Sequence, residues 1–100
     1  MRVIALSTLK AFWAGNPGRA DAERPVLAWY QDVLHADWSR PTDIKAQFGT
    51  ASILKDGRVV FNIGGNKYRL IAVIHFNRGK LYVRHVLTHA EYDEEKWKDE

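Results

Sequence analysis

The chain has 100 residues, of which 46% are hydrophobic and 27% are charged. This length fits one compact domain, which we expect to span residues 1–100. Near-average hydrophobic content argues against a disordered chain, and the lack of cysteine excludes disulfide scaffolds, zinc ribbons and thiol nucleophiles. No apolar stretch approaches the roughly 20 residues that a membrane-spanning helix needs. We therefore expect a cytoplasmic protein that makes no contact with a membrane.

The charges are distributed unevenly along the chain, although the net charge is only +3. From Lys55 to Arg84 there are seven basic residues and one acidic residue, whereas from Glu91 to Glu100 there are six acidic residues and two lysines. A basic centre favours binding of a polyanion such as nucleic acid. The alternative is a charged strand surface that prevents aggregation. The acidic tail is either an ordinary exposed helix or a shield over the basic surface.

Two helices are predicted in the first part of the chain. Ser7 is a suitable N-cap for a short helix that runs to about Ala14, before an Asn-Pro-Gly sequence. A second helix is predicted over residues 20–36. Because Pro25 is tolerated only near a first turn, this helix is expected to start closer to Arg24 than to residue 20.

The pattern changes from helical to extended near the middle of the chain. A third, short helix is predicted to run through Phe48, with Thr42 or Asp43 as its N-cap. After Gly49 the hydrophobic period falls from 3.6 to 2, and β-branched and aromatic residues become frequent. A weak strand is predicted over residues 51–55.

Three stronger strands follow, over residues 58–63, 66–76 and 80–87, with short glycine-containing connections between them. Connections this short require antiparallel pairing. A short helix is predicted to begin at Thr88. Helices followed by a meander predict an α+β fold, with two N-terminal helices packed on one face of a three- to four-stranded antiparallel sheet.

Polar side chains gather at the ends of the predicted strands. They are Asn62, Asn66, Lys67 and Arg69 around a Gly-Gly turn, and Arg84, His85, Thr88, His89 and Tyr92 at the other end of the meander. Cleavage of RNA without a metal needs a base for the 2′-hydroxyl, cations for the phosphorane and an acid for the leaving oxygen. His89 suits the base or the acid, Arg69 and Arg84 suit phosphate oxygens, and Tyr92 can orient or donate.

Each of these residues also has a purely structural interpretation. A histidine after a threonine is often a hydrogen-bonding residue of a loop, and Tyr92 beside acidic residues is often half-buried packing. His85 and His89 lie across a strand end without the spacing of a metal site, so no metal or other cofactor is predicted. The Gly64-Gly65 pair lacks the phosphate-binding glycine patterns and is a tight turn.

Several of these segments resemble the HigB family of bacterial type II toxins. The resemblance depends chiefly on VFNIGGNKYRL at residues 60–70 and THAEYD at residues 88–93, and weaker similarities extend it over nearly the whole chain. Two positions depart from the family pattern. His85 stands where the family commonly has a bulky aromatic residue, and Leu87 stands where it often has glycine.

The resemblance implies a RelE-like α+β fold and an endonuclease that cleaves mRNA during translation on the ribosome. It also implies inhibition by a HigA helix-turn-helix antitoxin, whose complex with the toxin binds operator DNA. Carried over by position, the catalytic residues are Arg69, Arg84, His89 and Tyr92, and the RNA-binding residues are Lys45, Asn62, Asn66 and Lys67. In an alternative division of roles, Lys67 or Lys45 and the arginines act electrostatically in place of a His89 base.

Two other functions are compatible with the sequence. One is a ParE-like toxin that shares the broad fold and poisons DNA gyrase without cleaving RNA. The other is an RNA-binding module without catalytic activity. For the nuclease, we expect Arg69→Ala and His89→Ala each to abolish growth arrest while the fold is retained.

Overall fold

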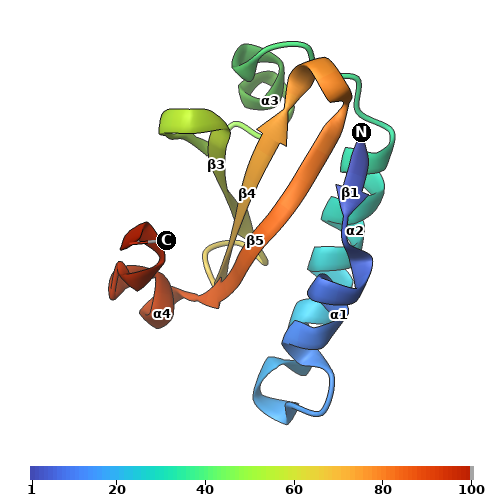
Figure 1. Ribbon diagram of the computed structural model, residues 1–100. Coiled ribbons are helices and arrows are strands. Elements are labelled where there is room, and N and C mark those ends of the chain that lie inside the picture. The colour runs from blue at the N-terminus through green and yellow to red at the C-terminus, as the bar shows by residue number, and fades with distance from the viewer. Residues whose placement is uncertain (100) are drawn as a thin grey trace.

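The computed structural model describes residues 1–99 and shows an α+β protein with one mixed five-stranded sheet (Figure 1). Glu100 of the predicted acidic tail lies outside the described residues. The elements are β1 (Arg2–Ile4), α1 (Leu6–Trp13), α2 (Glu23–Leu34), α3 (Pro41–Gln47), β2 (Ser52–Ile53), β3 (Arg58–Ile63), β4 (Tyr68–His75), β5 (Lys80–Thr88) and α4 (His89–Asp93), with 3-10 segments at Pro17–Ala22, Lys55–Gly57, Phe76–Arg78 and Lys96–Asp99. No helix in this part of the chain combines the length and the apolar character needed to cross a membrane.

The sheet has the strand order β1-β5-β4-β3-β2, and the β3-β4-β5 meander is antiparallel as predicted. β3 has the predicted bounds, whereas β4 is shorter because residues 66 and 67 belong to the preceding turn. The weak strand over residues 51–55 is reduced to the two residues of β2, since a 3-10 turn starts at Lys55. β1 was not predicted. It pairs parallel to β5, and three residues are too few to show a period of 2.

The first helix begins earlier than predicted. Ala5, with extended backbone angles, precedes α1, so Ser7 lies inside the helix and the prediction of Ser7 as N-cap is wrong. The second helix agrees with the prediction in its start, because α2 begins at Glu23 beside Arg24. A 3-10 segment over Pro17–Ala22 connects the two helices.

The N-cap of α3 was also predicted wrongly. Pro41 occupies the first helical position and Arg40 precedes it, so neither Thr42 nor Asp43 is the cap. The Asp43 carboxylate instead accepts hydrogen bonds from the backbone N–H groups of Ser39 (2.9 Å) and Arg40 (3.2 Å). The Asp43 side chain, which belongs to the first turn of α3, thus accepts hydrogen bonds from backbone N–H groups just before the helix.

One face of the sheet packs against α1 and α2, as predicted (Figure 1). Phe61 is at the centre of an aromatic cluster there, with ring centroids 5.2 Å from Trp29, 5.3 Å from Phe48 and 6.3 Å from Trp38. The opposite face carries a smaller apolar cluster around Trp97, which the C-terminal segment contributes. The sheet therefore has a face for the core and a second face that the C-terminal segment partly covers.

Replacing Gly57 with alanine is expected to lower the free energy of unfolding by about 1–3 kcal/mol. The φ angle of Gly57 is +77°, and a Cβ atom there would lie 3.0 Å from the Ile74 carbonyl oxygen. Gly49→Ala is the matched control, because Gly49 has no positive φ and an added Cβ atom there would meet nothing within 4 Å. Urea denaturation measures both. Equal stabilities of the two variants would contradict the strain at Gly57.

Candidate functional site

The polar residues predicted at two ends of the meander lie together at one end of the sheet. Because β4 and β5 are antiparallel, Tyr68 pairs with Thr88, and the backbone N–H of His89 donates to the Lys67 carbonyl at 3.1 Å. The β3–β4 turn and the start of α4 are therefore neighbours. The sequence interpretation that placed the two groups at opposite ends was wrong, because it ignored the reversal of β5 relative to β4.

Arg69 is buried at this end of the sheet, with only 8% of its surface exposed. Its guanidinium donates hydrogen bonds to the Asn66 carbonyl (3.1 Å), the Asn66 Oδ1 atom (2.6 Å) and the Tyr68 carbonyl (3.3 Å). The same guanidinium lies over the ring of Tyr92, 5.3 Å from its centroid. The structure therefore brings Arg69, Asn66 and Tyr92 together, and Arg69 holds both the turn and the tyrosine in place.

A capping box fixes the start of α4. The Glu91 N–H donates to Thr88 Oγ1 at 3.2 Å, and the Thr88 N–H donates to Glu91 Oε1 at 2.9 Å. Arg19 of the 3-10 segment also donates to the Glu91 carboxylate at 3.2 Å. These bonds hold α4 against the end of β5 and connect it to the N-terminal helical layer.

His89, the first residue of α4, is paired with Asp93 one turn later. His89 Nδ1 lies 2.9 Å from Asp93 Oδ2, and the two side chains are 47% and 60% exposed. A carboxylate on Nδ1 orients the ring and leaves Nε2 able to accept a proton. The sequence interpretation missed Asp93. The i,i+4 spacing of the two residues in a predicted helix was the signal that could have identified it.

Lys67 points away from Arg69, toward the 3-10 segment that precedes α2. Its ammonium forms an ion pair with Asp21, whose carboxylate also accepts a hydrogen bond from the Tyr68 hydroxyl. The lysine holds the pKa of Asp21 below its ordinary value, and Asp21 raises the pKa of Lys67 above its own. Lys67 therefore stays protonated, which fits an electrostatic role and not that of a base.

Two predicted RNA-binding residues lie on the β2 side of the sheet. Asn62 pairs across from Arg69, and its Nδ2 donates to the Thr50 carbonyl at 3.3 Å. Lys45, on α3, donates to the Gly49 carbonyl at 2.9 Å. Asn62 is thus beside the Arg69 cluster, whereas none of the contacts between described residues connects Lys45 with that cluster.

Arg84 occupies a β-bulge in β5. Ile71 pairs with His85 and the next residue of β4 pairs with Val83, so Arg84 is the additional residue. Its side chain is exposed, and within residues 1–99 it makes no hydrogen bond or ion pair. Arg84 nevertheless contributes to a small cavity in the second sheet face, with Arg58, Ile71, His85 and Trp97.

Trp97 lines this cavity and also contacts Tyr92 of the Arg69 cluster. It is 4% exposed, and its ring stacks on Tyr92 with centroids 5.2 Å apart. The cavity beneath it measures about 10 Å³, which is enough for one water molecule and too small for a phosphate group. Entry of a phosphate into this cavity thus requires the C-terminal segment to move, whereas the exposed Arg84 can be reached from outside it. The segment lies against the face that carries Arg58 and Arg84, as a shield would.

The free energy of unfolding is expected to fall as the pH drops below about 4.3, the ordinary pKa of glutamate, and Glu91 contributes to this loss. The Thr88 N–H chiefly, and Arg19 in addition, hold the pKa of Glu91 below that value in the folded chain. The stabilisation is therefore complete above the unfolded pKa and is lost as the pH falls through the folded pKa.

Glu91→Gln removes this contribution while keeping an oxygen that can accept the Thr88 hydrogen bond. Urea denaturation between pH 3 and pH 7 is expected to show a smaller loss of stability for the variant as the pH falls. Asp21 and Asp43, whose pKa values are also lowered, are present in both chains, so the difference between the two profiles comes from Glu91. Identical pH profiles would contradict an ionised Glu91 as part of the fold.

Comparison with known proteins places these residues in a family. The family described as HigB toxin, the RelE-like toxic component of a toxin–antitoxin system, matches residues 22–95, a range that contains every predicted site residue. The mRNA interferase toxin HigB of Escherichia coli K12 is 41% identical over 70 residues, which cover 68% of this chain and 67% of the relative. The mRNA interferase HigB of Shigella flexneri has the same identity and coverage. An mRNA interferase HigB from an Escherichia coli O6:H1 strain is 33% identical over 66 residues, 64% of each chain. The chain belongs to the HigB family of RelE-like toxins.

Proposed function

We propose that this protein is the toxin of a type II toxin–antitoxin system and acts as an endoribonuclease on mRNA. Family membership and the relatives named mRNA interferases support this function. The observation in the structure that supports it best is the His89–Asp93 pair, which lies on α4 one turn from Tyr92. A histidine oriented by a carboxylate beside a cationic sheet face has the groups that RNA cleavage needs.

The proposed reaction transfers the phosphoryl group from the 5′-oxygen of one nucleotide to the 2′-oxygen of the nucleotide before it. His89 Nε2 takes the proton of a 2′-hydroxyl, whose oxygen attacks the adjacent phosphorus. The bond from phosphorus to the 5′-oxygen breaks, the 5′-oxygen takes up a proton, and a 2′,3′-cyclic phosphate remains. Arg84 stabilises the charge on the phosphorane, and Tyr92 orients the phosphate or donates the proton. Arg69 acts as a positioning residue through Tyr92, because its own donors face Asn66 and Tyr68.

The predicted RNA-binding residues contact the RNA chain in this proposal. Lys67 supplies a fixed positive charge, and Asn62 and Asn66 contact the backbone near the β3–β4 turn. Lys45 contacts a more distant part of the RNA, since α3 is separate from the Arg69 cluster. Such contacts position the substrate without determining the chemistry.

The proposed partners follow from the same family. The substrate is mRNA in the course of translation, so the ribosome is a partner and the site of action is the cytoplasm. Alignment of the mRNA by the ribosome would lower the entropic cost of reaction at a site with a single oriented histidine. The inhibitor is a HigA-type helix-turn-helix antitoxin, through which the toxin associates with operator DNA.

Primer extension on a reporter mRNA tests the function. After induction of the toxin, we expect cuts within the translated frame, and we expect these cuts to disappear when translation initiation is blocked. Cuts that persist without translation would contradict the role of the ribosome and leave a free ribonuclease. Intact mRNA together with induced DNA damage in arrested cells would contradict the nuclease and favour the ParE-like gyrase toxin.

A further inference from the structure

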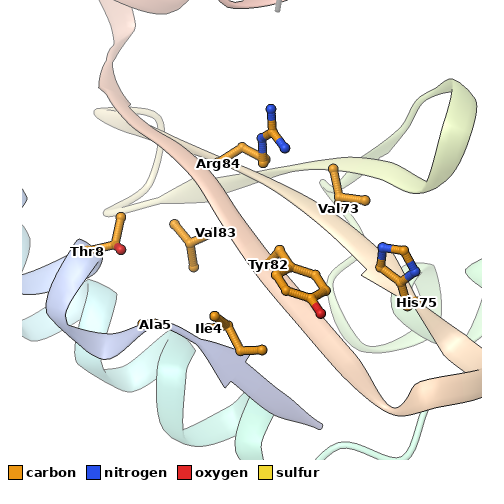
Figure 2. A pocket seen from close by; sticks show the side chains of 8 residues that line it. All are labelled: Ile4, Ala5, Thr8, Val73, His75, Tyr82, Val83 and Arg84. Carbon is orange, nitrogen blue, oxygen red and sulfur yellow. The ribbon is translucent and has the colours of Figure 1, made fainter.

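A groove of about 560 Å³ lies between the N-terminal segment and the second face of the sheet (Figure 2). Its lining residues are Ile4, Ala5, Thr8, Val73, His75, Tyr82, Val83 and Arg84. We propose that this groove is a subsite for one nucleobase of single-stranded RNA, farther along β5 from the cleavage site at α4. The proposal rests on the ribonuclease function proposed above, and it adds a position at which the base, and not only the backbone, is recognised.

The walls of the groove have the chemistry of a base-stacking site. The rings of His75 and Tyr82 are 5.2 Å apart and nearly perpendicular, at 78°. Figure 2 shows both rings on neighbouring strands at one side of the groove, with Ile4 of β1 facing them and Val83 beside it. Proteins bind unpaired bases by stacking them on aromatic rings and closing the other side with apolar groups. Tyr82 and His75 are half-buried and exposed respectively, so both are accessible.

Arg84 connects the groove to the proposed site of cleavage. It lines the groove on one side and the small cavity with Arg58 and His85 on the other. Because the bulge turns this exposed arginine out of the ladder, its guanidinium is available for a phosphate between the two places. A nucleotide whose base enters the groove would thus have its phosphate at Arg84, and the chain would continue toward α4.

The charges around the groove favour a polyanion over a basic or neutral partner segment. None of the eight lining residues is acidic. Lys80 pairs with His75 on one side and with Arg2 on the other, so two further cations flank the groove at the β1 edge. Single-stranded nucleic acid is held by this combination, a cationic path that follows the backbone and rings that stack on the bases.

Binding of a non-cleavable RNA analogue tests the subsite. The probes are a fluorescent 2′-fluoro hexanucleotide, which has no 2′-hydroxyl, and a series in which one base at a time is removed; fluorescence anisotropy measures the dissociation constants. For the wild-type chain we expect one abasic probe to bind about tenfold more weakly than the parent. Tyr82→Ala should weaken binding of the parent probe about tenfold. The abasic probe should then bind this variant as tightly as the parent probe does.

Further variants make the result specific. Tyr82→Phe keeps the ring and is expected to bind as the wild type does. His75→Ala removes an exposed ring, so it reports on the groove even where Tyr82→Ala fails to fold. Arg84→Ala should weaken all probes more than Arg24→Ala, which removes an exposed arginine of α2 outside the groove.

Four outcomes would overturn the subsite. Three concern probe binding: equal loss at every abasic position, equal binding by His75→Ala and the wild-type chain, and no saturable binding by the wild-type chain. Loss of affinity for the antitoxin in His75→Ala and Tyr82→Ala, with unchanged probe binding, would assign the groove to a protein partner and also overturn it. The nuclease function is tested separately by cleavage of the reporter mRNA, so these outcomes leave that function standing.

Discussion

Replacing His89 with alanine is expected to lower the rate of mRNA cleavage by about 100-fold or more, with little change in stability. The side chain is 47% exposed and contacts the Asp93 carboxylate at 2.9 Å, so its loss removes the base without opening the core. Because Thr88 and Glu91 form the capping box of α4 from their own atoms, the helix is retained. Reporter mRNA cleavage gives the rate, and urea denaturation gives the free energy of unfolding.

Two variants show whether His89 acts as a base. His35→Ala removes another exposed histidine, at the end of α2, and should leave cleavage unchanged. Asp93→Asn keeps the size of the partner but not its charge. We expect a smaller loss of cleavage rate than for His89→Ala, together with a shifted pH profile of cleavage. Unchanged cleavage by His89→Ala would contradict the assignment and favour the alternative in which lysine and arginine side chains act electrostatically.

The strands of the meander could be predicted because their signal is local. β3 is rich in β-branched and aromatic residues and is bounded by turns with glycine, so its limits agree with the sequence pattern. β1 and β2 could not be predicted in the same way. Each has two or three residues, and each exists because a longer strand offers it a partner, β5 for β1 and β3 for β2. A local sequence pattern indicates which residues face the core, but it does not show which strand has an unpaired edge that a short segment can join.

The structure brings part of the predicted site together, in an arrangement that the sequence did not predict. The motifs around residues 60–70 and 88–93 do meet at one end of the sheet, as the shared chemistry required. Their internal contacts were not predictable, because Arg69 turns inward to Asn66 whereas Lys67, two residues earlier, reaches Asp21. The burial of Trp97 over Ile71 was missed as well. The contacts of Lys67 with Asp21 and of Trp97 with Ile71 join residues far apart in sequence, and no local spacing encodes them.

Arg69→Ala is expected to lower both the stability and the cleavage rate, in contrast to His89→Ala. The sequence alone predicts that the two variants lose activity with the fold intact, but Arg69 is 8% exposed and donates three hydrogen bonds within the protein. Removing it takes the donor from the Tyr68 carbonyl in a buried contact and from two oxygens of Asn66 in partly buried contacts, at a cost of about 1–3 kcal/mol. The loss of the cation–π contact with Tyr92 adds about 1 kcal/mol.

A set of variants separates this positioning role from direct contact with RNA. Arg69→Lys retains a cation that can lie over Tyr92 but cannot reproduce the fork that bonds Asn66, so it should recover part of the cleavage and little of the stability. Tyr92→Phe keeps the ring over Arg69 and should retain stability while cleavage falls. Arg78→Ala, at an exposed turn, is the control for loss of charge. A stable Arg69→Ala chain with abolished cleavage would contradict the positioning role and indicate that Arg69 binds the phosphate itself.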